Sequence, residues 1–170
     1  MRTGTAIKRR ALDWLDRLGT SREQRSELAR LAASNDTGEL EEALAPDRTA
    51  TLAPQGHGPW IDKLAGVVTR RLHQLDTPEA QNALRRLVQH PEKDVRAAAV
   101  NRLADNPGES TSNALLVALD DEDELVRVAA MVGLGEARWG PAVLRIEERL
   151  EAGGRLERRV AVDALRKIRG

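Results

Sequence analysis

The sequence of 170 residues contains no cysteine, which excludes disulfide bonds, thiolate metal sites and a cysteine nucleophile. Phenylalanine and tyrosine are also absent, so a core of leucine, valine and alanine is expected. No apolar run approaches the length of a membrane span, and no hydrophobic segment of a signal peptide follows the basic N-terminus. We therefore expect a cytoplasmic protein with no membrane association.

The chain also lacks an excess of either charge. Its 27 basic residues balance 27 acidic ones, which does not favour a polyanion as partner. The charges are nevertheless unevenly placed, because residues 110–140 are mainly acidic and residues 141–170 mainly basic. Any basic surface is expected at the C-terminal end.

A period of 31 residues runs through residues 77–170. The shift aligns apolar positions that share one helix face, such as Leu84, Leu115 and Ile146. A second helix repeats as well, and three of its aligned sets are Ala99, Ala130 and Ala161; Leu103, Leu134 and Leu165; and the polar set Arg96, Arg127 and Arg158. A turn-forming stretch separates the two helices of each copy. The pattern predicts three helical hairpins that stack, because one hairpin cannot bury both apolar faces.

Residues 94–99 and 124–130 resemble the second helix of short HEAT-like repeats, the class that includes the bilin-lyase-type repeats. The resemblance implies an all-α fold, an α-solenoid of stacked helical hairpins. That family covers scaffolds, lyases and nucleic-acid enzymes, so the resemblance leaves the ligand open. The third copy departs from the pattern, with Glu157 at a valine position and Arg149 at an apolar one. We interpret residues 141–170 as a C-terminal cap whose polar side chains meet water.

The N-terminal residues 1–76 are expected to hold degenerate hairpins of the same solenoid, so that residues 1–170 form a single domain. Residues 60–75 align with a second helix, and residues 37–45 are its expected partner. Residues 46–59 contain three prolines and two glycines and are predicted to form a loop.

Helix caps support this division of the N-terminal part. A capping box is expected from Asp36 to Glu39, at the start of the partner helix. Residues 7–18 have the spacing of an amphipathic helix, and a cap formed by Thr20 and Glu23 is expected to begin the next one.

The candidate chemical sites are better explained as structural features. We expect the repeated arginines to pair with turn acids or to cap carbonyl groups of the neighbouring hairpin, rather than to form a ladder for phosphates. Residues 120–124 are acidic but lack the ligand spacing and glycine of a calcium loop, which indicates a solvated turn. His57, His73 and His90 are not at metal-ligand spacing, so no metal site is expected.

The expected partner-binding surface lies on the helix at residues 124–135. Val128, Met131 and Val132 are apolar and fall opposite the face used by the stack, and a helix apolar all round is covered on both sides. We predict that a partner helix docks there with Arg159 at the rim, and Trp139 in the next turn is a second candidate contact. N-terminal helices that fold back over this face, or a homodimer through it, are alternatives that the sequence leaves open.

Because no catalytic constellation is found, the leading hypothesis is a non-enzymatic protein–protein interaction module, an adaptor or scaffold without a cofactor. The alternative is a nucleic-acid-binding protein or a HEAT-like DNA-repair enzyme similar to alkylpurine glycosylases, with Trp139 and Asp163 as the available aromatic and carboxylate. Neutral net charge and scarce aromatic residues argue against that alternative. A lyase or chaperone activity has only the repeat resemblance behind it.

Overall fold

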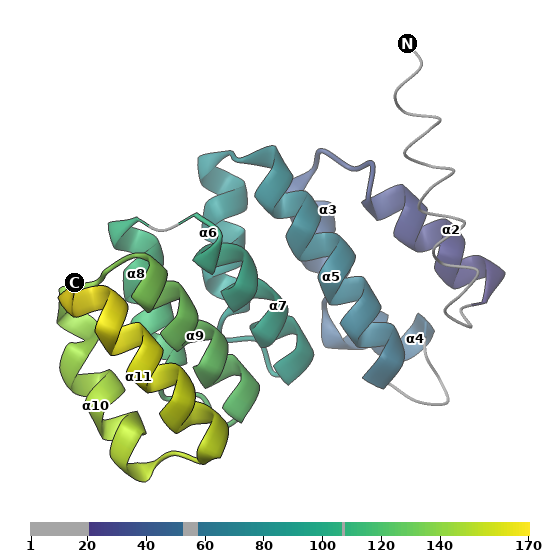
Figure 1. Cartoon of the computed structure of the whole chain (residues 1–170). Coiled ribbons are helices and arrows are strands. Elements are labelled where there is room, and N and C mark those ends of the chain that lie inside the picture. Colours follow the sequence, from purple (N-terminus) through teal and green to yellow (C-terminus); the bar gives the residue numbers. More distant parts are fainter. Residues whose placement is uncertain (1–20, 53–57, 107) are drawn as a thin grey trace. The chain divides into compact units, whose positions relative to one another are not determined.

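The computed structural model describes residues 21–52, 58–106 and 108–170, and every regular element in these ranges is a helix (Figure 1). The predicted all-α fold is confirmed. The chain divides into two compact units, Met1–Ala83 and Leu84–Gly170. No helix in the described ranges is long and apolar enough to cross a membrane. The expected helix at residues 7–18 lies outside the described residues, and a single domain over residues 1–170 stays a prediction.

The first unit is organised around its longest helix. It contains α2 (Arg22–Leu31), α3 (Thr37–Glu42), α4 (Pro46–Leu52), α5 (Gly58–Leu75) and the start of α6 (Pro78–Leu87). Helix α5 packs against α2 and α3, and Arg71 on α5 donates from Nε to the carbonyl oxygen of Ser34 at 2.7 Å. The fully buried side chains are mostly leucines: Leu28, Leu31, Leu40, Leu44, Leu64 and Leu72. The expected pairing of α3 with the helix at residues 60–75 is therefore confirmed.

The predicted loop at residues 46–59 is wrong in its first half, where the chain forms α4. Pro46 is the first residue of that helix, a position where the missing N–H has no intrahelical acceptor and the fixed φ already suits a helix. The amides of Arg48 and Thr49 both donate to the carbonyl oxygen of Ala45 at 3.0 Å, which starts the helical pattern. Residues 53–57 lie outside the described residues.

The caps differ in detail from the predicted ones. Helix α2 is capped one residue later than expected: Ser21 Oγ accepts from the amide of Gln24 at 3.2 Å, and Gln24 Oε1 accepts from the amide of Ser21 at 2.9 Å. At α3, Asp36 accepts from the amide of Glu39 at 3.2 Å, as predicted. The Glu39 carboxylate instead accepts from Ser34 and pairs with Arg30, so this capping box is not closed.

The second unit contains the predicted hairpins. Its helices are the end of α6, α7 (Lys93–Ala104), α8 (Glu109–Ala118), α9 (Glu124–Glu136), the short 3-10 helix η1 (Gly140–Ala142), α10 (Val143–Ala152) and α11 (Arg155–Arg169). Helices α7, α9 and α11 lie side by side, with α8 and α10 in a second layer (Figure 1). Helix α9 is the central one, since it contacts α7, α8 and α11.

Two glycines let α9 approach its neighbours closely. A Cβ atom on Gly133 would lie 2.7 Å from Cβ of Ala104 on α7 and 2.8 Å from Cδ1 of Leu115 on α8. A Cβ atom on Gly135 would lie 2.9 Å from Cα of Ala164 on α11. Small residues at these points therefore set the spacing between the repeats on both sides of α9.

We predict that Gly133→Ala destabilises the protein by about 1 to 3 kcal/mol, because the added methyl group overlaps two packed side chains. Gly66→Ala on α5 is the matched control, since nothing lies within 4 Å of the added Cβ atom. At an unstrained helical site this exchange stabilises by about 0.4 to 1 kcal/mol. Chemical denaturation of both variants measures the two effects, and destabilisation of equal size in both would contradict the close-packing argument.

Candidate protein-binding surface

Arg96 connects two consecutive hairpins. Its NH1 atom donates to the carbonyl oxygens of His90 and Pro91 at 3.0 and 2.9 Å, in the turn of its own hairpin. Its Nε and NH2 atoms donate to Asp121 at 2.7 and 3.0 Å, in the turn of the next hairpin. Both side chains are nearly buried, and the hydrogen bond to Asp121 raises the pKa of Arg96. This arginine is therefore structural, as predicted, although the carbonyl groups it caps belong to its own hairpin.

Arg127 makes the same connection with a different acid. Its NH1 atom donates to the carbonyl oxygens of Asp121 and Glu122 at 2.7 and 2.8 Å, and its Nε atom donates to Glu157 at 2.7 Å. The residue equivalent to Asp121 in the third repeat is Ala152, which has no carboxylate. Glu157 on α11 takes over that function from a valine position.

Glu157 is therefore not a water-facing residue of a cap, and that interpretation is wrong. The residue is buried, and its second carboxylate oxygen accepts from the amide of Gly154 at 3.1 Å. A charged group can occupy this apolar position because Arg127 and a backbone amide satisfy both oxygens.

Arg158 is the third arginine of the series and is only partly engaged. Its NH1 atom donates to the carbonyl oxygen of Gly153 at 2.8 Å, again in the turn of its own hairpin. No carboxylate among the described residues pairs with it, and the side chain is exposed. The contact of the arginine with turn carbonyl groups is thus present in all three repeats, whereas its pairing with a carboxylate is present in two.

The acidic turn is less solvated than predicted. Asp121 is nearly buried against Arg96, and Asp123 caps α9 by accepting from the amide of Leu125 at 2.9 Å. Asp120 pairs with Arg145, and with Arg149 at 3.4 Å. Within the described ranges, no group of three His, Asp or Glu side chains could hold a metal ion.

We predict that Arg96→Ala lowers the free energy of unfolding by about 3 to 5 kcal/mol, because Asp121 is left buried without its partner. Arg158→Ala removes the equivalent side chain of the third repeat, which has no carboxylate partner, and is expected to cost a small fraction of that. Urea denaturation of the two variants tests the comparison. Equal losses would show that the contacts to turn carbonyl groups, rather than the ion pair, carry the effect.

The ion pair of Glu157 also predicts a pH dependence. The hydrogen bond from Arg127 lowers the pKa of Glu157 from its ordinary value of 4.5. A carboxyl group with a lowered pKa in the folded state contributes full stability above its unfolded pKa and loses it as the pH falls through the folded value. Between about pH 5 and about pH 3, the wild type should therefore lose more stability than Glu157→Gln. Parallel curves for the two proteins would contradict this assignment.

The exposed face of α9 carries an apolar ridge. Val132 is 43% exposed, Val128 is half-buried, and Leu125, which the sequence argument missed, is 61% exposed. The three residues follow one another at helical spacing and share one face. We call Leu125, Val128 and Val132 the α9 ridge. Leu125 could have been found as the residue one turn before Val128.

Met131 does not belong to this surface, and its assignment to the partner-binding site is corrected. Its side chain is fully buried, at 0% exposure. The equivalent residue of the first repeat, Val100, is also buried, whereas Val162 of the third repeat is 55% exposed. Helix α9 lies in the middle of the stack, where it contacts α7 and α11 in addition to α8 of its own hairpin. An apolar residue outside the interface with α8 can therefore still belong to the core.

The neighbouring helix α11, which packs against α9, carries exposed cationic residues. Arg159, placed at the rim by the sequence argument, is exposed. Together with Arg155 and Leu156 it lines an open pocket of about 330 Å³. Leu156 and Arg159 stand at the positions equivalent to Leu125 and Val128. Apolar and cationic side chains are therefore adjacent on this face.

Trp139 contributes to the end of α9 instead of standing out from the turn. Its amide donates to the carbonyl oxygen of Leu134 at 3.0 Å, and the preceding Arg138 has a φ of 51°. This is a Schellman-type helix end with a non-glycine residue in the left-handed region. The side chain is half-buried, and its indole N–H is buried without a hydrogen-bond partner in the described ranges. A packing role is favoured over a partner contact.

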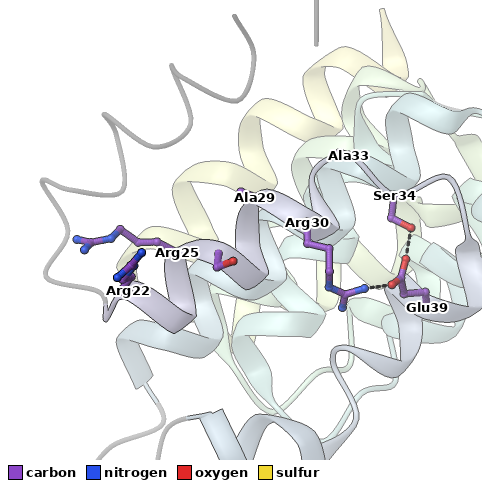
Figure 2. Close-up of a pocket in the computed structure, with 8 residues that line it drawn as sticks. Arg22, Arg25, Ala29, Arg30, Ala33, Ser34 and Glu39 are labelled. Atoms are coloured by element: carbon purple, nitrogen blue, oxygen red, sulfur yellow. Dashed lines mark hydrogen bonds and ion pairs between the residues drawn. The ribbon is translucent and has the colours of Figure 1, made fainter. Parts of the chain in front are cut away.

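A larger open pocket, of about 620 Å³, lies along α2 in the first unit. Figure 2 shows Arg30 and Ser34 directed toward Glu39, whereas Arg22 and Arg25 lie toward the other end of the helix. Among the described residues that line this pocket, Glu39 is the only one with a carboxylate, and it is already paired with an arginine and a hydroxyl group.

The repeat pattern matches a known protein family over part of the chain. Residues 62–135 match the family model described as HEAT repeats. These residues are HEAT repeats. No curated protein matches the chain. HEAT repeats are helical hairpins that stack into α-solenoids, so the predicted fold class is confirmed. The match ends at the close of α9, before the third hairpin with its altered residues Arg149 and Glu157.

Proposed function

We propose that the chain is a non-enzymatic protein-interaction module whose partner docks on the α9 ridge. HEAT repeats are typically interaction modules, and the ridge is the observation that carries the proposal. Exposed apolar side chains in a continuous row mark interaction sites more often than single exposed residues do. The proposal includes a cytoplasmic location and requires no cofactor.

The chemistry of the ridge favours an amphipathic helix with acidic residues as the partner. Leu125, Val128 and Val132 offer an apolar stripe that matches one side of a helix. Arg155 and Arg159, on the neighbouring helix α11, are exposed and have no carboxylate partner among the described residues. Apolar contacts would supply affinity, and the arginines would set the orientation.

The alternative is a nucleic-acid-binding protein, which the same exposed arginines favour. The groups that a glycosylase-type site would use are otherwise engaged. Trp139 is half-buried at a helix end, and Asp163 pairs with Arg166 and Lys167 at 2.7 Å, which lowers its pKa. Retention on a DNA column that decreases steeply with salt would favour the alternative.

We predict that Leu125→Glu and Val132→Glu each abolish capture of the partner from the source cell. A buried carboxylate opposite apolar residues costs more than the contact gains. Val117→Glu on α8 is the matched control, because Val117 is 55% exposed but lies on a first helix rather than on the ridge. Quantitative mass spectrometry of the captured proteins, with circular dichroism to verify folding, gives the result. The proposal fails if the same proteins are retained by all three variants.

A further inference from the structure

We propose that Arg158 and Val162, on the outer face of α11, form a second docking site that takes an acidic segment of a partner protein. The site does not depend on the α9 ridge. It follows from comparing the same positions in three successive repeats. In the first two repeats the following hairpin supplies a carboxylate to the arginine, and the apolar side chain is buried. In the third repeat both side chains are exposed.

One hydrogen bond orients the guanidinium group of Arg158 and leaves its other donors available to a carboxylate. In Arg96 and Arg127, the NH1 atom bonds to turn carbonyl groups and the Nε atom donates to a carboxylate of the next hairpin. Arg158 keeps the first contact, from NH1 to Gly153. The Nε and NH2 atoms have no carboxylate partner among the described residues. Because one contact already orients the side chain, less conformational entropy is lost when a carboxylate binds.

An apolar contact lies one turn further along α11. Val162 is 55% exposed, while its equivalents Val100 and Met131 are buried. The ligand chemistry is therefore a carboxylate, as in Asp121 or Glu157, followed at helical spacing by an apolar side chain. Exposed Arg155 and Arg159 beside the site also favour an acidic segment.

The occupant is not another repeat stacked at the same spacing. The closest approach between second helices uses small residues, as at Ala104 with Gly133 and at Gly135 with Ala164. The residue equivalent to Ala104 and Gly135 in the third repeat is Arg166, whose side chain is exposed. A long side chain at this point prevents a helix from approaching as closely. A single acidic segment can dock near Arg158 without reaching Arg166, since the two residues lie two turns apart.

The test uses the full chain and a synthetic peptide with the sequence of residues 118–132. This peptide carries Asp121 and Glu122, whose carboxylates both accept hydrogen bonds from Arg96 in the folded chain. Arginine Nε–H signals are followed by NMR as the peptide is added up to about millimolar concentration, in the range of weak complexes. We expect the Arg158 signal and the Val162 methyl signals to shift. A peptide with Asp121→Asn and Glu122→Gln should leave both unchanged. Absence of a shift at Arg158 with the acidic peptide would overturn the proposal.

Two variants separate a specific carboxylate site from general attraction to positive charge. Arg158→Gln should weaken peptide binding by about tenfold or more, as expected for loss of a charge-assisted bond. Arg155→Gln removes the same charge one turn away and should change the affinity for the peptide by about threefold at most. Equal weakening would overturn the proposal, as would tighter binding of oligothymidine than of the peptide. Light scattering measures the oligomeric state, and a monomer is expected. A dimer that Arg158→Glu dissociates would overturn the proposal, because a second copy of the chain would then occupy the site.

Discussion

The second unit depends on one interaction, an arginine that bonds at once to the turn of its own hairpin and to a carboxylate of the next. The turn carbonyl groups hold the side chain in place, and the carboxylate couples two hairpins through an ion pair that is nearly buried, whereas the other ion pairs between hairpins, such as Lys93–Asp123, are more exposed. Apolar packing between helices is tolerant of small rotations, whereas a bidentate ion pair is not. The Arg96–Asp121 pair therefore restricts the register in which α7 packs on α9.

The same coupling is kept in the third repeat although its turn has lost the acid. Glu157 supplies the carboxylate from the first turn of α11, and Gly154 provides the amide that fixes it. The replacement shows that the geometry around the arginine is retained while the source of the negative charge changes. This explains why a repeat that departs from the family pattern still packs closely, with Ala164 against Gly135.

Periodicity predicted the helices of the second unit and the structural character of the arginines, because both arise from contacts that recur with the repeat. It failed for Met131 and Glu157, whose burial depends on residues of other helices that the pattern of one helix does not show. Met131 was assigned to the surface because its burial depends on neighbouring second helices, which the pattern of one helix does not reveal. Glu157 is predicted to face water because its partner, Arg127, lies 30 residues earlier in the sequence. The helix starting at Pro46 was missed because proline was counted as a breaker without regard to its position.

Arg158, with a turn carbonyl group but no carboxylate partner in the described chain, has a consequence for the order in which the second unit opens. Its α11 helix is joined to one neighbouring hairpin, whereas α9 is joined to two. Amide hydrogens exchange fastest where the local free energy of opening is smallest. Local unfolding is therefore expected to begin at α11 and to reach α9 last. The Arg127–Glu157 pair must break before unfolding spreads from α11 to α9. A ligand that occupies Arg158 would slow exchange throughout α11.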